Sequence, residues 1–386
     1  MRRLLLLVSV VVFVDTMLYA ALTPLLPRFA HEFHLSKSGA GALVAAYAAG
    51  ALIGGLPGGV LAVRIGARRA VLVGLTLMGV SSVGFALAGN VELLFAARVA
   101  QGLGSAFTWA GAFAWLLLAA PRDRRGELIG AAMGAAVVGA LFGPVVGAGA
   151  ALAGRAAIFS ALGGLAVVLV AWALRMPSPA PEKPSRSRLA GALGNGLFAG
   201  GMALLIVASV LAGVLSVLAP LHLAAGGWNA TAIGALWLLS AGVEAAASPF
   251  IGRLSDRRGA VLPARYALAA GGVVSIALAL GGRPLPYAFF VLVASVAYGL
   301  LFTPAFALIA DGAERVGLAQ GLAFGAMSAA WALGAVIGPA VGGLLAGAVG
   351  DWVPFVLAAA VCGLALIAAR GRSSRRVLTG GVGAVR

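Results

Sequence analysis

Twelve apolar runs, each about long enough to cross a lipid bilayer, decide what this chain can fold into. A helix needs about 20 predominantly apolar residues to span the hydrocarbon core. Only 10% of the residues are charged, against roughly a quarter in soluble domains. We therefore predict an all-α membrane protein with spans at about 4–26, 40–62, 70–88, 92–118, 127–150, 156–174, 192–221, 231–251, 262–281, 286–310, 319–345 and 352–369.

The positions of the basic residues give this count an orientation. If the N-terminus is cytoplasmic and the spans alternate, 22 of the 27 Lys and Arg residues fall on the cytoplasmic side and four fall outside, with Arg98 inside a span. Such a split is what the positive-inside rule predicts. The net charge of +16 is thus interpreted as a topology signal rather than a nucleic-acid surface. We expect both termini on the cytoplasmic side of the cell (inner or plasma) membrane.

The chain divides into two similar halves. Residues 175–191 are rich in Pro, Ser and basic residues, which is typical of a flexible linker. GALFGPVVG at 139–147 matches GAVIGPAVG at 334–342, and LTPLL at 22–26 matches LAPLH at 218–222, with nearly equal offsets. Matches of this kind predict a parallel duplication. The predicted organisation is a six-helix bundle at 1–174, a cytoplasmic linker at 175–191, a second six-helix bundle at 192–370 and a basic tail at 371–386.

Three motifs resemble signatures of the major facilitator superfamily, over roughly residues 4–370. The fourth-span signature R-x-x-Q-G-x-G is complete from Arg98 to Gly104, and G-x-x-x-G-P-x-x-G is complete from Gly139 to Gly147. The loop signature G-x-L-[AS]-D-R-x-G-x-R-R begins at Gly59 but has Val63 where the family has aspartate. The resemblance implies two pseudo-symmetric six-helix bundles that work by alternating access, as a monomer. The fifth-span motif further resembles the drug:proton antiporter branches.

The resemblance also implies which residues gate and pack the bundles. The second half keeps the loop aspartate as Asp256, so gating is expected to rely more on this residue with neighbouring arginines. Small residues four apart let helices approach closely, which suggests that both GxxxGP strings pack at the interface between the halves. The gating and packing residues are predicted to be Gly59, Arg64, Gly66, Arg68, Arg69, Gly139, Gly143, Pro144, Gly147, Arg253, Asp256, Arg257, Gly334, Gly338, Pro339 and Gly342.

Charges in the middle of spans are few, and they are candidates for function because burying a charge in lipid is costly. Asp15 lies at the centre of the first run, where a carboxylate could bind a proton or a cation but not both. Arg98 begins a polar stripe on one helix face. The resemblance implies that it contributes to proton coupling, with Asp15 as its expected partner. Glu244 shares a face with Trp237, Ser240 and Ser248, and could be a second proton or substrate site or could pair with arginines at an inner gate.

Aromatic and polar side chains near these charges are predicted to line the substrate cavity, where aromatic faces suit lipophilic or cationic compounds. The predicted set is Tyr19, Gln101, Ser105, Trp109, Trp237, Ser240, Tyr298, Phe302 and Trp331.

These observations favour a secondary transporter that exports a small lipophilic or cationic compound in exchange for protons. No cofactor is expected, since the proton gradient would supply the energy, and no metal cluster, nucleophile-and-base set or Walker sequence indicates an enzyme or an ATP-driven pump. One alternative keeps the fold and makes the protein a proton symporter or uniporter that imports sugars or other metabolites. The other is a membrane receptor or scaffold without transport.

Overall fold

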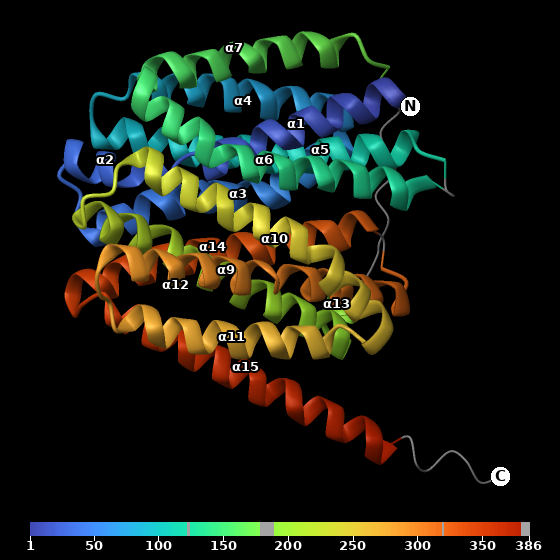
Figure 1. The fold of residues 1–386 in the computed structure, drawn as a ribbon. Coiled ribbons are helices and arrows are strands. Elements are labelled where there is room, and N and C mark those ends of the chain that lie inside the picture. Colours follow the sequence, from blue (N-terminus) through green and yellow to red (C-terminus); the bar gives the residue numbers. More distant parts are fainter. Residues whose placement is uncertain (122–123, 178–188, 319, 380–386) are drawn as a thin grey trace.

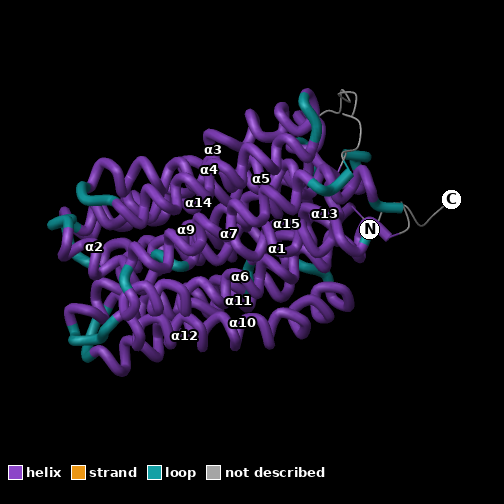
Figure 2. Tube along the Cα trace, turned by 90° about the horizontal axis from the view of Figure 1, so that it is seen from above, coloured by secondary structure: helices purple, strands orange, loops and turns teal. Residues whose placement is uncertain are grey.

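A computed structural model of the chain describes residues 1–121, 124–177, 189–318 and 320–379. Within these residues it confirms the predicted all-α fold, with twelve helical segments long and apolar enough to cross a membrane and no strand. Figure 2 shows the helices running side by side, with the loops gathered at two ends.

The helices of the first half are α1 (Arg2–Ala20), the 3-10 turn η1 (Thr23–Leu25), α2 (Leu26–Glu32), α3 (Lys37–Arg64), α4 (Ala67–Leu87), α5 (Val91–Ala119), α6 (Arg125–Ala153) and α7 (Arg155–Leu174). Those that follow are the short α8 (Leu189–Leu193), α9 (Gly196–Ala225), α10 (Ala230–Arg258), α11 (Val261–Ala279), α12 (Pro284–Gly299), α13 (Phe302–Arg315), α14 (Gln320–Ala348) and α15 (Trp352–Thr379).

Two of the predicted spans are broken rather than straight. The first consists of α1, η1 and α2. Its break at 21–22 lies just before Pro24, which, like Pro27, lacks a backbone donor. The tenth consists of α12 and α13, separated by Leu300 and Leu301, shortly before Pro304. Backbone groups freed by such breaks need partners or a wet cavity inside a membrane, so breaks of this kind often mark working parts of a transporter.

Several helices start at polar caps that the sequence places at the loops. The side chains of Ser36, Asn90, Asn195 and Asn229 each accept hydrogen bonds from backbone N–H groups in the first turn of α3, α5, α9 and α10. These bonds satisfy donors that a helix leaves free at its N-terminus. At the turn between α3 and α4, Gly66 has a φ of 100°, a conformation that favours glycine.

The two ends of the bundle differ in charge. We call the end with the N-terminus and the α3–α4 and α10–α11 turns the basic end, since Arg64, Arg69, Arg257 and Arg258 lie there. The opposite end, with the α2–α3, α9–α10 and α14–α15 turns, is called the far end. The last described helix, α15, also ends toward the basic end in Figure 1.

The halves meet along two seams. The helices before the linker lie in the upper part of Figure 1 and those after it in the lower part, with α3 packed on α14 and α6 packed on α10 between them. A Cβ atom at Gly41 would collide with the carbonyl oxygen of Pro339, and one at Gly234 would come within 3.0 Å of that of Pro144. Glycine is thus needed at Gly41, where one helix backbone lies directly on the other.

The GxxxGP strings serve both inside each half and between the halves. Gly139, Gly143 and Gly147 face α1, where added side chains would strike Phe13, Ala20 and Ala21. The matching residues Gly334 and Gly338 face α9 of their own half. The expectation of a packing site between the halves therefore holds for the prolines, whereas the glycine rows pack each half internally.

Candidate functional site

The carboxylate of Asp15 lies in the interior of the first half and accepts three hydrogen bonds. Asp15 is 2% exposed, and its Oδ1 accepts from the Tyr47 hydroxyl at 3.0 Å. Its Oδ2 accepts from the Ser105 hydroxyl at 2.9 Å and from the indole N–H of Trp109 at 2.5 Å. Helices α1, α3 and α5 therefore converge on one carboxylate. Donors of this number and kind suit its charged form, which can only accept.

Arg98 lies beside this site but does not form an ion pair with Asp15 in the described residues. Its guanidinium carbon lies 4.9 Å from the centre of the Tyr47 ring, and its Nη1 donates to the Gln101 side chain at 3.0 Å and to the Leu18 carbonyl at 3.3 Å. Its buried Nε has no hydrogen-bond partner among the residues that the structure describes. The same tyrosine thus faces the arginine with its ring and the aspartate with its hydroxyl.

Tyr47 was missed in the sequence analysis although a signal was available. It is the only side chain with a hydrogen-bonding group in the run 40–62, which otherwise contains aliphatic residues, glycine and proline. Such a residue in an apolar span needs a polar partner, since an unpaired hydroxyl in an apolar setting is costly.

The polar stripe of α5 is buried as one face. Arg98, Gln101, Ser105 and Thr108 are at most 5% exposed. Gln101 donates to Ser82 at 3.4 Å, and Thr108 donates to the backbone of its own helix. Among these residues only Ser105 contacts Asp15 directly.

Aromatic contacts connect the site to the second half. The Tyr19 ring lies 5.1 Å from the Tyr47 ring and 5.2 Å from that of Trp331 on α14. Nearer the basic end, Phe113 stacks on Phe324 of α14 at 5.4 Å with the rings 12° from parallel. Of the residues proposed for the cavity, Tyr19, Trp109 and Trp331 are therefore the ones that link Asp15 to the interface between the halves.

Other residues of the predicted cavity lie elsewhere. Tyr298 is 1% exposed and turns toward α11, where its hydroxyl is 2.7 Å from that of Ser275, so it does not lie between the halves. The Ser240 hydroxyl is used by the Leu236 carbonyl of its own helix. Phe302 contacts Phe306 one turn along α13, and Trp237 is partly buried in the core of the second half.

Glu244 lies at the middle of α10, fourteen residues from either end. Its carboxyl group covers Gly299, the last residue of α12. Its side chain forms no ion pair or hydrogen bond with any described residue, so the expected pairing with arginines of the inner gate is not observed there.

The residues expected to gate the basic end are mostly exposed. Arg68 donates to the Met176 carbonyl at 3.0 Å, and Arg253 lies over the Phe250 ring at 5.1 Å. Arg64, Arg69 and Arg257 are exposed. The side chain of Asp256 lies outside the described residues.

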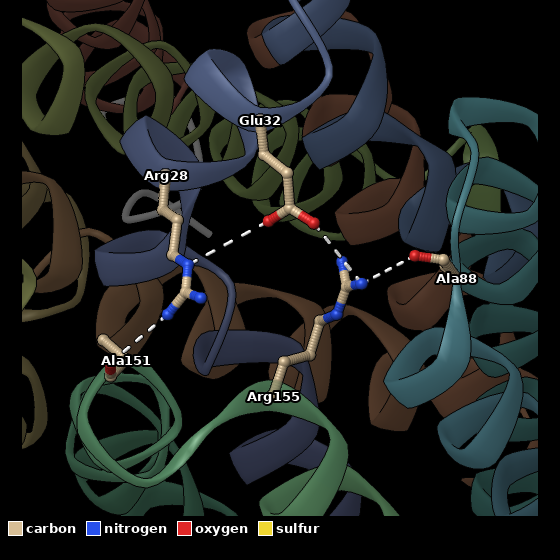
Figure 3. Close-up of polar contacts among 5 residues, drawn as sticks. All are labelled: Arg28, Glu32, Ala88, Ala151 and Arg155. Carbon is tan, nitrogen blue, oxygen red and sulfur yellow. Dashed lines mark hydrogen bonds and ion pairs between the residues drawn. The ribbon is translucent and has the colours of Figure 1, made fainter.

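At the far end a network of two arginines and one glutamate fixes α2 to the rest of its half (Figure 3). Glu32 lies 3.9 Å from Arg28 and 3.5 Å from Arg155, which also donates to the Ala88 carbonyl at 2.6 Å. Arg155 further lies over the rings of Phe29 and Phe33. This network holds the broken end of the first span in place.

Together the fold and these sites define an integral membrane protein with buried charges, built from two similar halves that meet along glycine-lined seams. The chain belongs to the Major Facilitator Superfamily, whose family model matches residues 8–326.

Curated relatives align over only part of their length. The chain is 30% identical to multidrug resistance protein 1 of Bacillus subtilis over 41% of this chain and 42% of that one. It is 29% identical to the quinolone resistance protein NorA of Staphylococcus aureus over 32% of each chain. The chain thus matches less than half the length of these relatives.

Solved transporters share the fold over nearly the whole chain at low identity. A bacterial homologue of the human lysosomal transporter Spinster has a TM-score of 0.76 at 16% identity, covering 95% of this chain and 96% of that one. A POT family transporter in complex with 5-aminolevulinic acid has a TM-score of 0.77 at 14% identity, covering 96% of both chains.

Proposed function

We propose that this protein is a proton-coupled exporter of small lipophilic or cationic compounds, which works by alternating access with its basic end in the cytoplasm. The relatives named for multidrug and quinolone resistance support the efflux class. The charge difference between the two ends supports the orientation. Small-molecule substrate and protons would then cross the cell membrane in opposite directions.

The observation that carries the proposal is the set of donors around Asp15. A carboxylate inside a span is stable only with partners, and here Tyr47, Ser105 and Trp109 supply them. A proton bound to Asp15 would occupy an oxygen that now accepts from these donors, so the set must rearrange when the proton arrives. We propose Asp15 as the main proton carrier.

Arg98 would couple this rearrangement to the helices. It touches the Tyr47 ring and the Leu18 carbonyl, so a movement of Tyr47 changes the surroundings of a buried positive charge. The same tyrosine ring packs on Tyr19, which contacts Trp331 across the interface. The structural change that follows protonation of Asp15 would be transmitted to the second half through the contacting rings of Tyr47, Tyr19 and Trp331, and not through a direct Asp15–Arg98 ion pair.

Proteoliposomes with an acidic interior test the proposal, since outward proton flow should drive ethidium inward. We expect gradient-driven uptake by the natural protein and none by Asp15→Asn, while Glu92→Gln, which removes an exposed carboxylate at the far end, keeps the natural rate. Uptake that ignores the pH gradient, or that survives in Asp15→Asn, would contradict proton-coupled export. Uptake only with an acidic exterior would indicate symport instead.

A further inference from the structure

We infer that Glu244 is the binding site for the positive charge of a lipophilic organic cation, in the second half and separate from the proton site at Asp15. This inference rests on the proposed function and assigns a substrate class and an anchor to it. It starts from a contrast between the two mid-span carboxylates, of which Asp15 is buried and Glu244 is partly buried. Asp15 accepts three hydrogen bonds, whereas the carboxylate of Glu244 accepts none from any described residue.

The neighbours of Glu244 on its own helix are already committed. Ser240 donates to the Leu236 carbonyl at 2.8 Å, and Ser248 donates to the backbone carbonyl of Glu244 at 2.8 Å. Neither hydroxyl therefore donates to the carboxylate. Arg253 is nine residues further along α10, about 13 Å at the helical rise, and its guanidinium lies over Phe250.

The position of Glu244 makes an uncompensated charge costly. It lies in the central turn of a candidate span, where a charged residue without a partner is costly. Internal donors would be the usual remedy, and the described residues supply three for Asp15 but none for Glu244. A charge that the protein leaves unpaired in such a place is suited to an external cation.

The Glu244 carboxyl group packs against Gly299, where α12 ends. Any side chain on Gly299 would collide with the Glu244 carboxyl group, so the absence of a Cβ makes room for that group. Gly299 ends α12, and the C-terminal end of a helix carries partial negative charge. Half-helix C-termini coordinate cations in other transporters. Carboxylate and helix end therefore both favour a positive ligand.

The duplicated scaffold shows that the acid is specific to this half. At the offset of 193 that relates Gly41 to Gly234, the position equivalent to Glu244 is Ala51. The position equivalent to Asp15, at the offset of 196, is Leu211. Each half thus has one mid-span acid that the other lacks, which is what separate proton and cation sites require.

Two probes of the same shape and opposite charge test the inference: tetraphenylphosphonium and tetraphenylborate, bound to the purified full chain in nanodiscs. We expect the natural protein to bind the cation and reject the anion. Glu244→Gln should weaken cation binding at least tenfold, Glu244→Asp should restore part of it, and Gly299→Ala should weaken it by displacing the carboxylate. Glu92→Gln is the matched charge control, and size-exclusion profiles and thermal unfolding check that each variant is folded.

The outcomes separate this inference from the proposed function. Natural affinity in Glu244→Gln, with proton-driven ethidium uptake intact in the natural protein, overturns the cation site and leaves the exporter standing. Loss of cation binding in Asp15→Asn but not in Glu244→Gln also overturns it, since the two charges would then share Asp15. A natural protein that neither binds the cation nor transports ethidium overturns both.

Discussion

The ammonium group of Lys37 lies 2.5 Å from the carboxylate of Asp351, and this ion pair joins the two halves at the far end. Lys37 begins α3, and Asp351 lies in the turn between α14 and α15. One turn further along α3, the backbone at Gly41 packs against the backbone of α14 at Gly343. In this structure the far end is therefore closed by the backbone packing of α3 on α14 and by the partly exposed ion pair next to it.

Carbodiimide, which joins an amine to a carboxylate without adding atoms, should link Lys37 to Asp351. Both side chains are about 40% exposed, so the reagent can reach them, and a pair this exposed contributes only about 0–1 kcal/mol and is easily broken. We expect the linked peptide by mass spectrometry in the natural protein but not in Asp351→Asn. Linking should stop transport, since alternating access needs this end to open. Full transport by linked protein would show that the halves do not separate here.

Removing the Tyr47 hydroxyl should impair coupling while leaving the stacked rings in place. A hydrogen bond to a charged group contributes about 1.5–3 kcal/mol, so Tyr47→Phe should slow gradient-driven uptake roughly tenfold or more. Tyr19→Phe is the matched control, because the neighbouring Tyr19 ring has no hydroxyl hydrogen bond within the described residues. In an Asp15→Asn background the effect of Tyr47→Phe should be smaller, since contacting residues are not additive. Equal effects in both backgrounds would show that the hydroxyl acts elsewhere.

Adding one methyl group at Gly41 should destabilise the closed far end. The new Cβ would collide with the Pro339 carbonyl oxygen, and overpacking typically costs about 1–3 kcal/mol. Gly55→Ala on the same helix meets open space and should instead be neutral or stabilise by up to about 1 kcal/mol, because alanine favours helix. Thermal unfolding in detergent compares the two variants. A Gly41→Ala protein as stable as Gly55→Ala would show that the seam yields without cost.

Loss of Arg155 should cost more than loss of Arg28, although both contact Glu32. Arg155 is 17% exposed and donates to the Ala88 carbonyl at 2.6 Å. Arg28 is 50% exposed, its ion pair is 3.9 Å long and its hydrogen bond to the Ala151 carbonyl is the longer one, at 3.2 Å. We expect Arg155→Ala to lower the unfolding free energy by about 2–3 kcal/mol, since hydrogen bonds of charged groups are the stronger ones, and Arg28→Ala by less than about 1 kcal/mol. Thermal unfolding monitored by tryptophan fluorescence gives the comparison. The reverse order would mean that α2 is fixed by other contacts.

The number and approximate limits of the spans could be predicted from the sequence because apolar length alone decides them in a membrane. The breaks in the first and tenth spans could not, since Pro24 and Pro304 do not say whether a neighbouring helix compensates for the lost donors. Asp15 and Arg98 stood out as charges among apolar residues. Their connection through Tyr47 depends on how α1, α3 and α5 are rotated, which periodicity leaves open when a helix is apolar all round.

Tyr298 is a case in which the unknown rotation of a helix made a sequence prediction wrong. An aromatic side chain with a hydroxyl suits a substrate cavity, but Tyr298 lies on the face of α12 that is directed at α11, where its hydroxyl forms a hydrogen bond with that of Ser275. Glu244 could be predicted from the sequence as a mid-span acid. Its lack of partners among the described residues could not, because it depends on Ser240 and Ser248 donating to backbone carbonyls of their own helix.

The two seams carry a consequence for how the halves can diverge. At each one, a glycine of one half lies on a proline carbonyl of the other, and the two contacts come from equivalent positions of the duplication. Because main chain lies close to main chain there, the proposed alternating access would require few side chains to repack at these two contacts. A substitution inside one half leaves these contacts unchanged, whereas the position of Gly41 has no room for a larger residue. The interior of each half can therefore change while the two equivalent glycine–carbonyl contacts between the halves stay the same.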